Sequence, residues 1–442
     1  MLLKSSLRLF VLSSLLLAHL HGSSFLLDKK ENNTSDPTLL VIGGIHGNEP
    51  GGYFATAMLM QYYEITKGNL WIVPDLNRPS IQANSRGVHG DMNRKFSAIA
   101  PSDQDAPAVS SIKKTITDDQ VSLVLNLHDG HGFYRQNYTS TIFNPNAWGQ
   151  TCVIDQCNLS VNQPFGNLEE IAKKVSKQLN STLLEEHHTF NVKNTQTKFD
   201  DEAMQLSLTY FAVTHNKPAF AIETSKNLST LAEKVYYQLN AIESFMKIMG
   251  ISYHRHFTLS KKSVKNLLEN YGKIVINNKI SLNLNDIRNN LSFIPLPLFE
   301  STFSFTHPLG SVKQVKGDYV LYIGNKIITN LKPEHFKTKD CISKLPILVD
   351  GDQKDVTIAS ETFVTADFKV NASDRLRVNI IGYTDSGKKN ENGCLVALSD
   401  LNSKFSLDNA KRRYRIELYD DNSFCGMITV KFKKDEGQWT KQ

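Results

Sequence analysis

The feature that most constrains the fold is an alternation of short apolar runs and helical segments between about residues 37 and 250. The runs are almost continuously apolar, as expected for strands covered on both faces. They are TLLVI (38–42), NLWIV (69–73), VSLVLNL (121–127) and AFAI (219–222). In segments 167–180 and 228–250, apolar residues instead recur every three or four positions, which is typical of helices. Strands that alternate with helices predict an α/β unit with a largely parallel sheet.

Three of the apolar runs are followed by residues that can bind a metal or move a proton. The glycine-rich turn GGIHGNEPGG (43–52) follows the first run and holds His46 and Glu49. His128 directly follows the run 121–127, and Glu223 directly follows AFAI. Because open parallel sheets bind ligands at the carboxyl ends of their strands, we expect these side chains to converge.

His46, Glu49 and His128 make up the ligand set of a catalytic zinc site. Two imidazoles and one carboxylate leave the fourth position of a tetrahedral zinc ion for water. Glu223 is then the candidate general base, which takes a proton from that water and passes it to the leaving amine. Each residue alone has a simpler explanation, as a loop histidine, a strand-end histidine or a helix-capping carboxylate. Their shared placement at strand ends favours one metal-hydrolase site.

A basic cluster between the second and third expected ligands suits a carboxylate of the substrate. The segment SRGVHGDMNRKF (85–96) holds Arg86, Asn93 and Arg94. A guanidinium donates paired hydrogen bonds to a carboxylate, and an asparagine adds a neutral donor. We assign all three residues to substrate binding. Arg86 is also assigned to catalysis, since one of the two arginines could polarise the scissile carbonyl; the alternative is that the arginines are ordinary surface charge.

In this order, the HGNE motif, the arginine and asparagine cluster, the strand-end histidine and the later glutamate resemble the zinc carboxypeptidase superfamily of M14 type. The resemblance covers about residues 37–250. It implies an α/β/α sandwich built on a mixed eight-stranded sheet. It also implies one Zn²⁺ ion on the three ligands named above, with Glu223 as the base.

Two branches of that superfamily resemble this chain. HGNEP and DMNRKF are similar to the deacylase branch, which contains aspartoacylase and succinylglutamate desuccinylase. The export signal, the added C-terminal segments and LHDGHGFY (127–134) are more similar to the periplasmic DL-carboxypeptidases that trim peptidoglycan and determine cell shape in helical bacteria. That resemblance implies hydrolysis of the γ-D-glutamyl–meso-diaminopimelate bond, which converts a muropeptide tripeptide to a dipeptide. An N-acyl-amino-acid deacylase and a wall-binding protein with a vestigial site remain alternatives, and other cell-shape proteins are possible partners.

The implied substrate needs a second polar recognition set, because the leaving diaminopimelate carries an amine and a carboxylate at its distal centre. Trp148 and Thr209 are assigned to this role, with Arg135 and Asp129 as further candidates; Trp148 could instead be a packing residue. Digestive carboxypeptidases carry a mobile tyrosine before the base. Tyr210 precedes Glu223 by a shorter separation than is usual there, so we interpret it as a core residue.

The N-terminal segment 1–24 has the layout of a secretory signal, with Lys4 and Arg8 ahead of a short apolar run. The run is short for a membrane span, so we expect no stable membrane insertion after cleavage, with a retained anchor as the alternative. This predicts a periplasmic protein. The net charge of +6 is mild for 442 residues and predicts solubility rather than a nucleic-acid partner; weak attraction to an acidic polymer is the alternative.

After Gly250, the alternation of strand-like runs and helical segments gives way to short strand-like segments with polar turns between them. We expect the carboxypeptidase unit over residues 25–250, a small α+β or mostly β domain over 251–345, and an immunoglobulin-like β-sandwich over 346–442. In this last part, short alternating segments are separated by turns.

Five cysteines are present, and export permits disulfides. Cys152 and Cys157 are close enough to close a local loop. Cys394 and Cys425 each begin a probable strand and could pair across a sheet. Since five is an odd number, at least one thiol stays free or pairs elsewhere, and Cys341 has no assigned partner.

Overall fold

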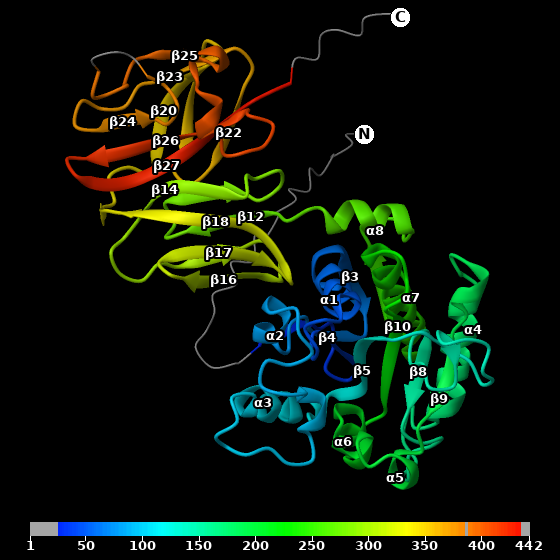
Figure 1. The fold of residues 1–442 in the computed structure, drawn as a ribbon. Helices are drawn as coiled ribbons and strands as arrows, with labels where there is room; N and C mark the ends of the chain where they lie inside the picture. Colours follow the sequence, from blue (N-terminus) through cyan, green and yellow to red (C-terminus); the bar gives the residue numbers. More distant parts are fainter. Residues whose placement is uncertain (1–24, 385–387, 435–442) are drawn as a thin grey trace, which may run out of the picture.

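The computed structural model describes residues 25–384 and 388–434, so the predicted signal segment 1–24 lies outside the described residues. The chain forms an α/β unit, followed by a part built almost entirely from strands (Figure 1). No helix of the two described ranges combines the length and the apolar character that crossing a bilayer demands.

The α/β unit is built on a mixed sheet whose seven strands follow the order β1-β4-β2-β5-β10-β8-β9. The inner strands β4, β2, β5 and β10 are parallel, whereas β1 is antiparallel to β4 and β8 is antiparallel to β10. The strand bounds are β1 (Asp28–Lys30), β2 (Thr38–Ile42), β4 (Asn69–Val73), β5 (Val121–Gly130), β8 (Thr151–Ile154), β9 (Asn191–Asn194) and β10 (Ala219–Ser225).

This sheet has seven strands among the described residues, not the eight that the resemblance implied. Strand β3 (Tyr63–Lys67) pairs instead with β11 (Ser252–Arg255) in a separate two-stranded ribbon. Gly68 lies between β3 and β4 with a φ of 78°, a left-handed conformation that glycine adopts without steric cost. The chain therefore reverses at this glycine, and β3 leaves the plane of the sheet.

Helix α7 (Leu231–Met249) illustrates how local sequence fixes an element. The Thr230 hydroxyl accepts a hydrogen bond from the backbone N–H of Glu233 at 3.2 Å, and the Glu233 carboxylate accepts one from the backbone N–H of Thr230 at 3.0 Å. Gly250 ends the helix with a φ of 72°. The predicted segment 228–250 is therefore helical only from Leu231, because this capping box sets the first turn.

The other helices surround the sheet at defined places. Helix α1 packs on α7, α7 packs on α4, and α3 and α6 contact β5. Their bounds are α1 (Pro50–Tyr62), α2 (Arg78–Gln82), α3 (Ala106–Ile116), α4 (Leu168–Asn180), α5 (Thr197–Asp200), α6 (Leu208–Thr214) and α8 (Lys261–Leu268).

Residues 273–335 form two small sheets that pack against the α/β unit. One sheet has the order β13-β12-β15 and the other β14-β18-β17-β16. Their buried apolar side chains continue the core of the α/β unit as one cluster. The strands are β12 (Lys273–Ile276), β13 (Ile280–Asn283), β14 (Asn290–Leu296), β15 (Phe303–Phe305), β16 (Gly310–Val315), β17 (Asp318–Ile323) and β18 (Lys326–His335).

The C-terminal part is rich in strands and encloses a second apolar core. One sheet has the order β19-β27-β26-β24, with β22 paired to β27, and the other has the order β21-β20-β23-β25. The strands are β19 (Lys337–Thr338), β20 (Lys344–Val349), β21 (Asp352–Thr357), β22 (Glu361–Val364), β23 (Asp367–Val370), β24 (Arg377–Ile380), β25 (Leu395–Ala397), β26 (Arg413–Asp420) and β27 (Ser423–Phe432).

The disulfide pattern differs from both predicted pairings. Cys341 and Cys425 form the bond, whereas Cys152, Cys157 and Cys394 are free. Cys394 precedes β25 in one sheet and Cys425 lies in β27 of the other, so they are not cross-strand neighbours. Cys152 lies within a fully buried strand, so its side chain is held away from the exposed Cys157.

Candidate active site

His128 and Glu223 lie side by side in the sheet. Strands β5 and β10 are parallel neighbours, and Glu223 is paired in register with His128. Both residues lie within their strands, whereas the sequence placed them just beyond. The strands are longer than predicted because their pairing continues to Gly130 and Ser225, which keeps the backbone groups hydrogen-bonded.

The turn between β2 and α1 brings His46 and Glu49 against His128. Oε2 of Glu49 lies 3.1 Å from Nδ1 of His46 and 2.8 Å from Nδ1 of His128. All three side chains are buried, and their ligand atoms lie within 4.8 Å of one another. Among the described residues, Nδ1 of His46 is a buried atom without a hydrogen-bond partner. An orphaned imidazole nitrogen that faces a carboxylate and a second imidazole fits a metal ligand, and two nitrogens with one carboxylate suit zinc.

Two glycines of this turn are needed for its shape. Gly44 has a φ of 76°, which disfavours any residue with a side chain. A Cβ on Gly47 would lie 1.9 Å from the carbonyl oxygen of Ser80. The turn can therefore hold His46 in place only because the backbone approaches α2 without a side chain between them.

A carboxylate that the sequence analysis did not single out, Asp91, orients the first ligand. Its Oδ1 lies 2.8 Å from Nε2 of His46, which leaves Nδ1 of that ring for a metal. Its Oδ2 accepts a hydrogen bond from Nε of Arg86 at 2.9 Å. Arg86 also donates from Nη1 to Oε1 of Glu49 at 3.2 Å. Arg86 thus lies beside the three candidate ligands and bridges Asp91 and Glu49.

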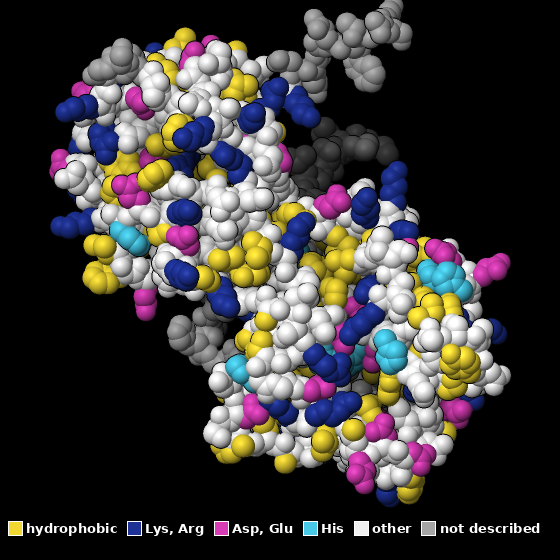
Figure 2. Space-filling model, in the orientation of Figure 1, with side chains coloured by type: hydrophobic (Ala, Val, Ile, Leu, Met, Phe, Trp, Pro, Cys, Tyr) yellow, Lys and Arg dark blue, Asp and Glu magenta, His cyan; other side chains and the backbone are white. Residues whose placement is uncertain are grey.

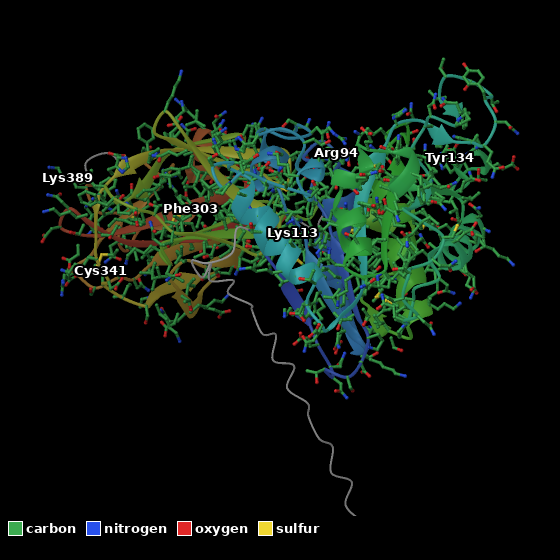
Figure 3. The ribbon with its side chains drawn as sticks, turned by 90° about the horizontal axis from the view of Figure 1, so that it is seen from below. Arg94, Lys113, Tyr134, Phe303, Cys341 and Lys389 are labelled. Atoms are coloured by element: carbon green, nitrogen blue, oxygen red, sulfur yellow. A yellow bond between two sulfur atoms is a disulfide. The ribbon has the colours of Figure 1, made fainter. Side chains whose placement is uncertain are left out.

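The three predicted clamp residues line one cavity with the ligands and with Glu223. The cavity has a volume of about 250 Å³. Oδ1 of Asn93 accepts a hydrogen bond from the backbone N–H of Leu208 at 3.0 Å, so the amide NH₂ is the group left to donate. Arg94 donates from Nη1 to the carbonyl of Asn93 at 3.0 Å. Figure 2 shows histidine and acidic side chains recessed among lysines and arginines on this unit, and Figure 3 shows where Arg94 lies on it.

The candidates for the distal centre fall in two groups. Trp148, Thr209 and Asp129 line the cavity, and Arg135 is not among the lining residues. The guanidinium of Arg135 donates to backbone carbonyls nearby, including that of Tyr134 at 2.8 Å. Arg135 therefore braces a loop rather than facing the ligands.

Asp129 has internal partners that occupy its carboxylate. Its Oδ2 accepts a hydrogen bond from the backbone N–H of Gly51 at 3.0 Å, at the first turn of α1, and its Oδ1 accepts one from Thr224. Asp129 thus ties β5 to α1 and β10, next to the candidate ligand His128.

Tyr210 lies on α6 with its side chain partly buried, and it does not line the cavity.

The electrostatics of the site separate its two glutamates. Burial alone raises the pKa of Glu49, but the charge of His46 and the hydrogen bond with Nδ1 of His128 bring it well below its usual range. Burial raises the pKa of Glu223 well above its usual range, and the negative charges of Glu49 and Asp129 raise it further. Two neighbouring carboxylates with opposite shifts suit a ligand that stays ionised and a base that can hold a proton.

Two further cavity residues were missed by the sequence analysis. Asn126 is fully buried two positions before His128, and neither its Nδ2 nor its Oδ1 has a partner among the described residues. Residues two apart in a strand share a face, so both point to the side of the sheet that holds the site. Nζ of Lys226 lies 3.4 Å from Oε1 of Glu49. The only signal in the sequence was their closeness to His128 and Glu223.

Lys193 on β9 holds the wall residue Trp148. Its Nζ lies 4.3 Å from the centroid of the Trp148 ring and donates to the carbonyls of Pro145 and Ala147, each at 3.0 Å. A cation over an indole face is attracted by the ring quadrupole. No pattern in the sequence marked this lysine, because the contact depends on how β9 lies beside the loop.

Comparisons with known proteins agree with this geometry. Residues 4–269 match a family described as the catalytic part of a carboxypeptidase controlling helical cell shape, and residues 338–433 match the C-terminal domain of a metallo-carboxypeptidase. No curated protein matches the chain.

Among solved structures, the apo form of the cell shape determinant protein Csd4 from Helicobacter pylori is 34% identical, with a TM-score of 0.86. The match covers 93% of this chain and 100% of that one. The mDAP-bound form of H. pylori Csd4, called a D,L-carboxypeptidase, is 35% identical at the same TM-score and covers 92% of this chain and 100% of that one. A tripeptide-bound Csd4 structure matches equally well, at 34% identity and over 93% of this chain and 100% of that one. The chain therefore belongs to the family of metallocarboxypeptidases that control helical cell shape, and it is a hydrolase of that type.

Proposed function

We propose that this protein is a periplasmic, zinc-dependent DL-carboxypeptidase that trims peptidoglycan. Its substrate is an uncrosslinked muropeptide tripeptide, and it hydrolyses the γ-D-glutamyl–meso-diaminopimelate bond to leave a dipeptide. The observation that carries the proposal is the buried group of His46, Glu49 and His128 beside Glu223, in a chain about one third identical to a D,L-carboxypeptidase. Through this trimming the protein influences cell shape, in company with other cell-shape proteins.

In this proposal the metal is zinc, held by Nδ1 of His46, the Glu49 carboxylate and Nδ1 of His128. When bound, the ion supplies Lewis acidity, which lowers the pKa of a water molecule and polarises a carbonyl. Asp91 holds the His46 ring in the orientation that keeps Nδ1 free.

Glu223 moves the proton of the reaction. It lies in register beside His128, so its carboxylate can take a proton from the attacking water. Its raised pKa allows the protonated form to persist until the amine of the leaving residue accepts that proton. Arg86, at the edge of the ligand group, stabilises the charge that develops on the carbonyl oxygen.

The remaining cavity residues recognise the leaving diaminopimelate. Arg86, Asn93 and Arg94 bind the free carboxylate next to the scissile bond. Trp148 and Thr209 form the wall for the distal centre. The buried amide of Asn126 has an unused donor and an unused acceptor, which match the distal carboxylate and ammonium of that residue. Arg135 takes no part in this recognition, because its guanidinium donates its hydrogen bonds to backbone carbonyls.

Three finer assignments accompany the function. The signal segment 1–24 would direct export to the periplasm, where the substrate lies. The α/β unit is assigned as an α/β/α sandwich, and the paired C-terminal sheets as an immunoglobulin-like β-sandwich. Two sheets that share one apolar core support the assignment of the C-terminal sheets.

The test combines metal analysis with product identification on a defined muropeptide tripeptide. The wild-type protein with zinc is expected to release diaminopimelate and leave the dipeptide. His128→Ala is expected to lose zinc and activity together, whereas Glu223→Ala keeps zinc and loses activity. His215→Ala, at an exposed site, serves as the matched control. Unchanged tripeptide in the presence of zinc would reject the substrate, and full zinc content in His128→Ala would reject the ligand set.

A further inference from the structure

A second groove, in the C-terminal part, lies far along the sequence from the catalytic cavity. It has a volume of about 980 Å³ and is lined by residues of the C-terminal part together with Asn283, Asn285 and Asp286, in and just after β13. None of the catalytic residues lines it. This volume lies at the upper end of the range of about 300–1,000 Å³ that ligand pockets span, so the groove has room for a ligand as large as a short polymer segment.

Four cations line this groove without a carboxylate partner among the described residues. They are Arg412, Lys431, Lys433 and Lys434. A fifth, Arg413, is buried and is neutralised by Glu361, whose Oε2 lies 2.6 Å from its Nε.

The two carboxylates of the groove are directed at backbone groups. Oδ1 of Asp408 accepts hydrogen bonds from the N–H groups of Arg412 and Arg413, each at 2.9 Å. Oδ2 of Asp286 accepts one from the N–H of Ala410 at 3.1 Å. The four cations therefore give the groove a local excess of positive charge.

An aromatic side chain stands beside these cations. Phe363, on β22, is 50% exposed, and Nζ of Lys431 lies 5.8 Å from its ring centroid. An exposed aromatic ring offers an apolar face that a sugar ring can cover, which removes both surfaces from water. The aromatic face of Phe363 and the ammonium groups of the neighbouring lysines together fit a ligand that carries sugar rings and carboxylates.

We propose that this groove binds the glycan strand of peptidoglycan with its stem peptides. A sugar ring packs on Phe363, and free carboxylates of the stems pair with Lys431 and Lys433. The proposal rests on the proposed function, since that function supplies a polymer of alternating sugars and acidic peptides. Each exposed ion pair contributes little alone, so binding depends on several contacts at once and weakens with salt. A second attachment point would hold the catalytic cavity near many stem ends and raise their effective concentration.

The test is cosedimentation of the full chain with purified insoluble sacculi. The Glu223→Gln background prevents digestion during the assay. Phe363→Ala combined with Lys431→Glu and Lys433→Glu is expected to weaken binding roughly tenfold. The matched control is Phe299→Ala with Lys332→Glu and Lys354→Glu, which changes an exposed phenylalanine and two exposed lysines elsewhere and should bind as the parent does. Equal binding by the groove variant and its parent would overturn the proposal.

Two further measurements distinguish the glycan strand from membrane lipid as the ligand, and the groove from residues 435–442 as the binding segment. Stronger binding to phosphatidylglycerol vesicles than to sacculi, lost in the same variant, would assign the groove to membrane lipid instead. Loss of sacculus binding in a chain that ends at Lys434 would assign binding to residues 435–442 and overturn the groove.

With Glu223 intact, the groove variant should cleave soluble tripeptide at the wild-type rate. Absence of that cleavage in the wild type would reject the proposed function, whereas normal cleavage with unaltered sacculus binding in the variant would reject only the groove.

Discussion

Oδ1 of Asp91 lies 2.8 Å from Nε2 of His46, so a carboxylate fixes the ring of this candidate ligand. The same carboxylate accepts a hydrogen bond from the backbone N–H of Asn93 at 2.9 Å and another from Nε of Arg86. One short side chain thus contacts a candidate metal ligand and two residues of the predicted substrate clamp. Burial raises the pKa of Asp91, but the hydrogen bond with His46 and the positive charges of His46 and Arg86 bring it below its usual range.

We expect Asp91→Asn to weaken zinc binding by about 10- to 100-fold, the usual effect of losing a partner that orients a ligand. The asparagine oxygen can still accept from the Asn93 backbone, so the turn should remain folded. Competition with a chelator measures the affinity. Asp103→Asn is the control, because that carboxylate pairs with Lys95 and not with a ligand. Equal zinc affinity in Asp91→Asn and the wild type would show that His46 is held by other contacts.

Asn126→Leu should raise the stability of the protein and lower its activity. The buried amide has no partner among the described residues, and such a group costs about 1–3 kcal/mol. Leucine has a similar shape and removes that cost, so the variant is expected to unfold at a higher temperature. Turnover of the diaminopimelate tripeptide should fall at least about tenfold, because the site loses a donor and an acceptor for the distal centre.

The matched substrate is a tripeptide with lysine in place of diaminopimelate, which lacks the distal carboxylate. The wild-type protein should prefer diaminopimelate over lysine, and Asn126→Leu should reduce that preference. A variant with wild-type turnover and wild-type selectivity would exclude Asn126 from substrate recognition.

Asp155 makes stability depend on pH. It is buried, and burial raises its pKa to about 6, while hydrogen bonds from Thr197 and Thr209 oppose the rise. A raised folded-state pKa means that the folded protein binds a proton more tightly than the unfolded chain does. Its favourable contribution is therefore fully present below about pH 4 and is lost as pH rises through about 6.

Asp155→Asn removes this dependence and keeps an oxygen for Thr197, whose hydroxyl lies 2.5 Å from Oδ1. Relative to the wild type, the variant should gain up to about 3 kcal/mol of unfolding free energy between pH 4 and pH 7.5. Urea titrations at both pH values measure this difference. Asp200→Asn, on the exposed side of α5, should give no such gain. A constant difference between wild type and Asp155→Asn across this range would contradict the assignment.

Residues whose position depends on the local sequence could be predicted, whereas residues whose role depends on contacts distant in the sequence could not. The runs 38–42 and 69–73 were predicted with their observed bounds, because fully buried parallel strands have no polar face to obscure them. The convergence of His46, Glu49 and His128 was predictable, because each residue is tied to a strand or turn that the sequence marks. Asp91 and Asn126 were not, since their roles depend on a distance of 2.8 Å in one case and on buried, unpaired atoms in the other.

The predicted disulfide pairings were wrong for the same reason. Which cysteines meet depends on how the two C-terminal sheets and the segment after β19 come together, and the strand pattern alone does not contain that information. Cys341 lies outside any strand, so nothing local linked it to Cys425 in β27.

Cys341→Ser should destabilise the C-terminal part and leave catalysis intact. The bond joins residues separated by 84 positions. In the chain-entropy account, closing a loop of that length raises the free energy of the unfolded chain by roughly 4.5 kcal/mol. Figure 3 shows Cys341 in the strand-rich part, well apart from Arg94 in the α/β unit. We therefore expect a lower urea midpoint for the C-terminal transition, with unchanged turnover of soluble tripeptide.

A thiol reductant should reproduce this shift in the wild type and have no further effect on Cys341→Ser. Cys157→Ser is the matched control, because Cys157 is exposed and forms no disulfide. If the C-terminal core is cooperative with the sheets that adjoin the α/β unit, both transitions should fall together, since Met427 and Phe424 of β27 belong to the larger apolar cluster. If neither the substitution nor the reductant changes the urea midpoint of the C-terminal transition, the disulfide does not stabilise this part. Packing alone would then hold Cys341 against β27.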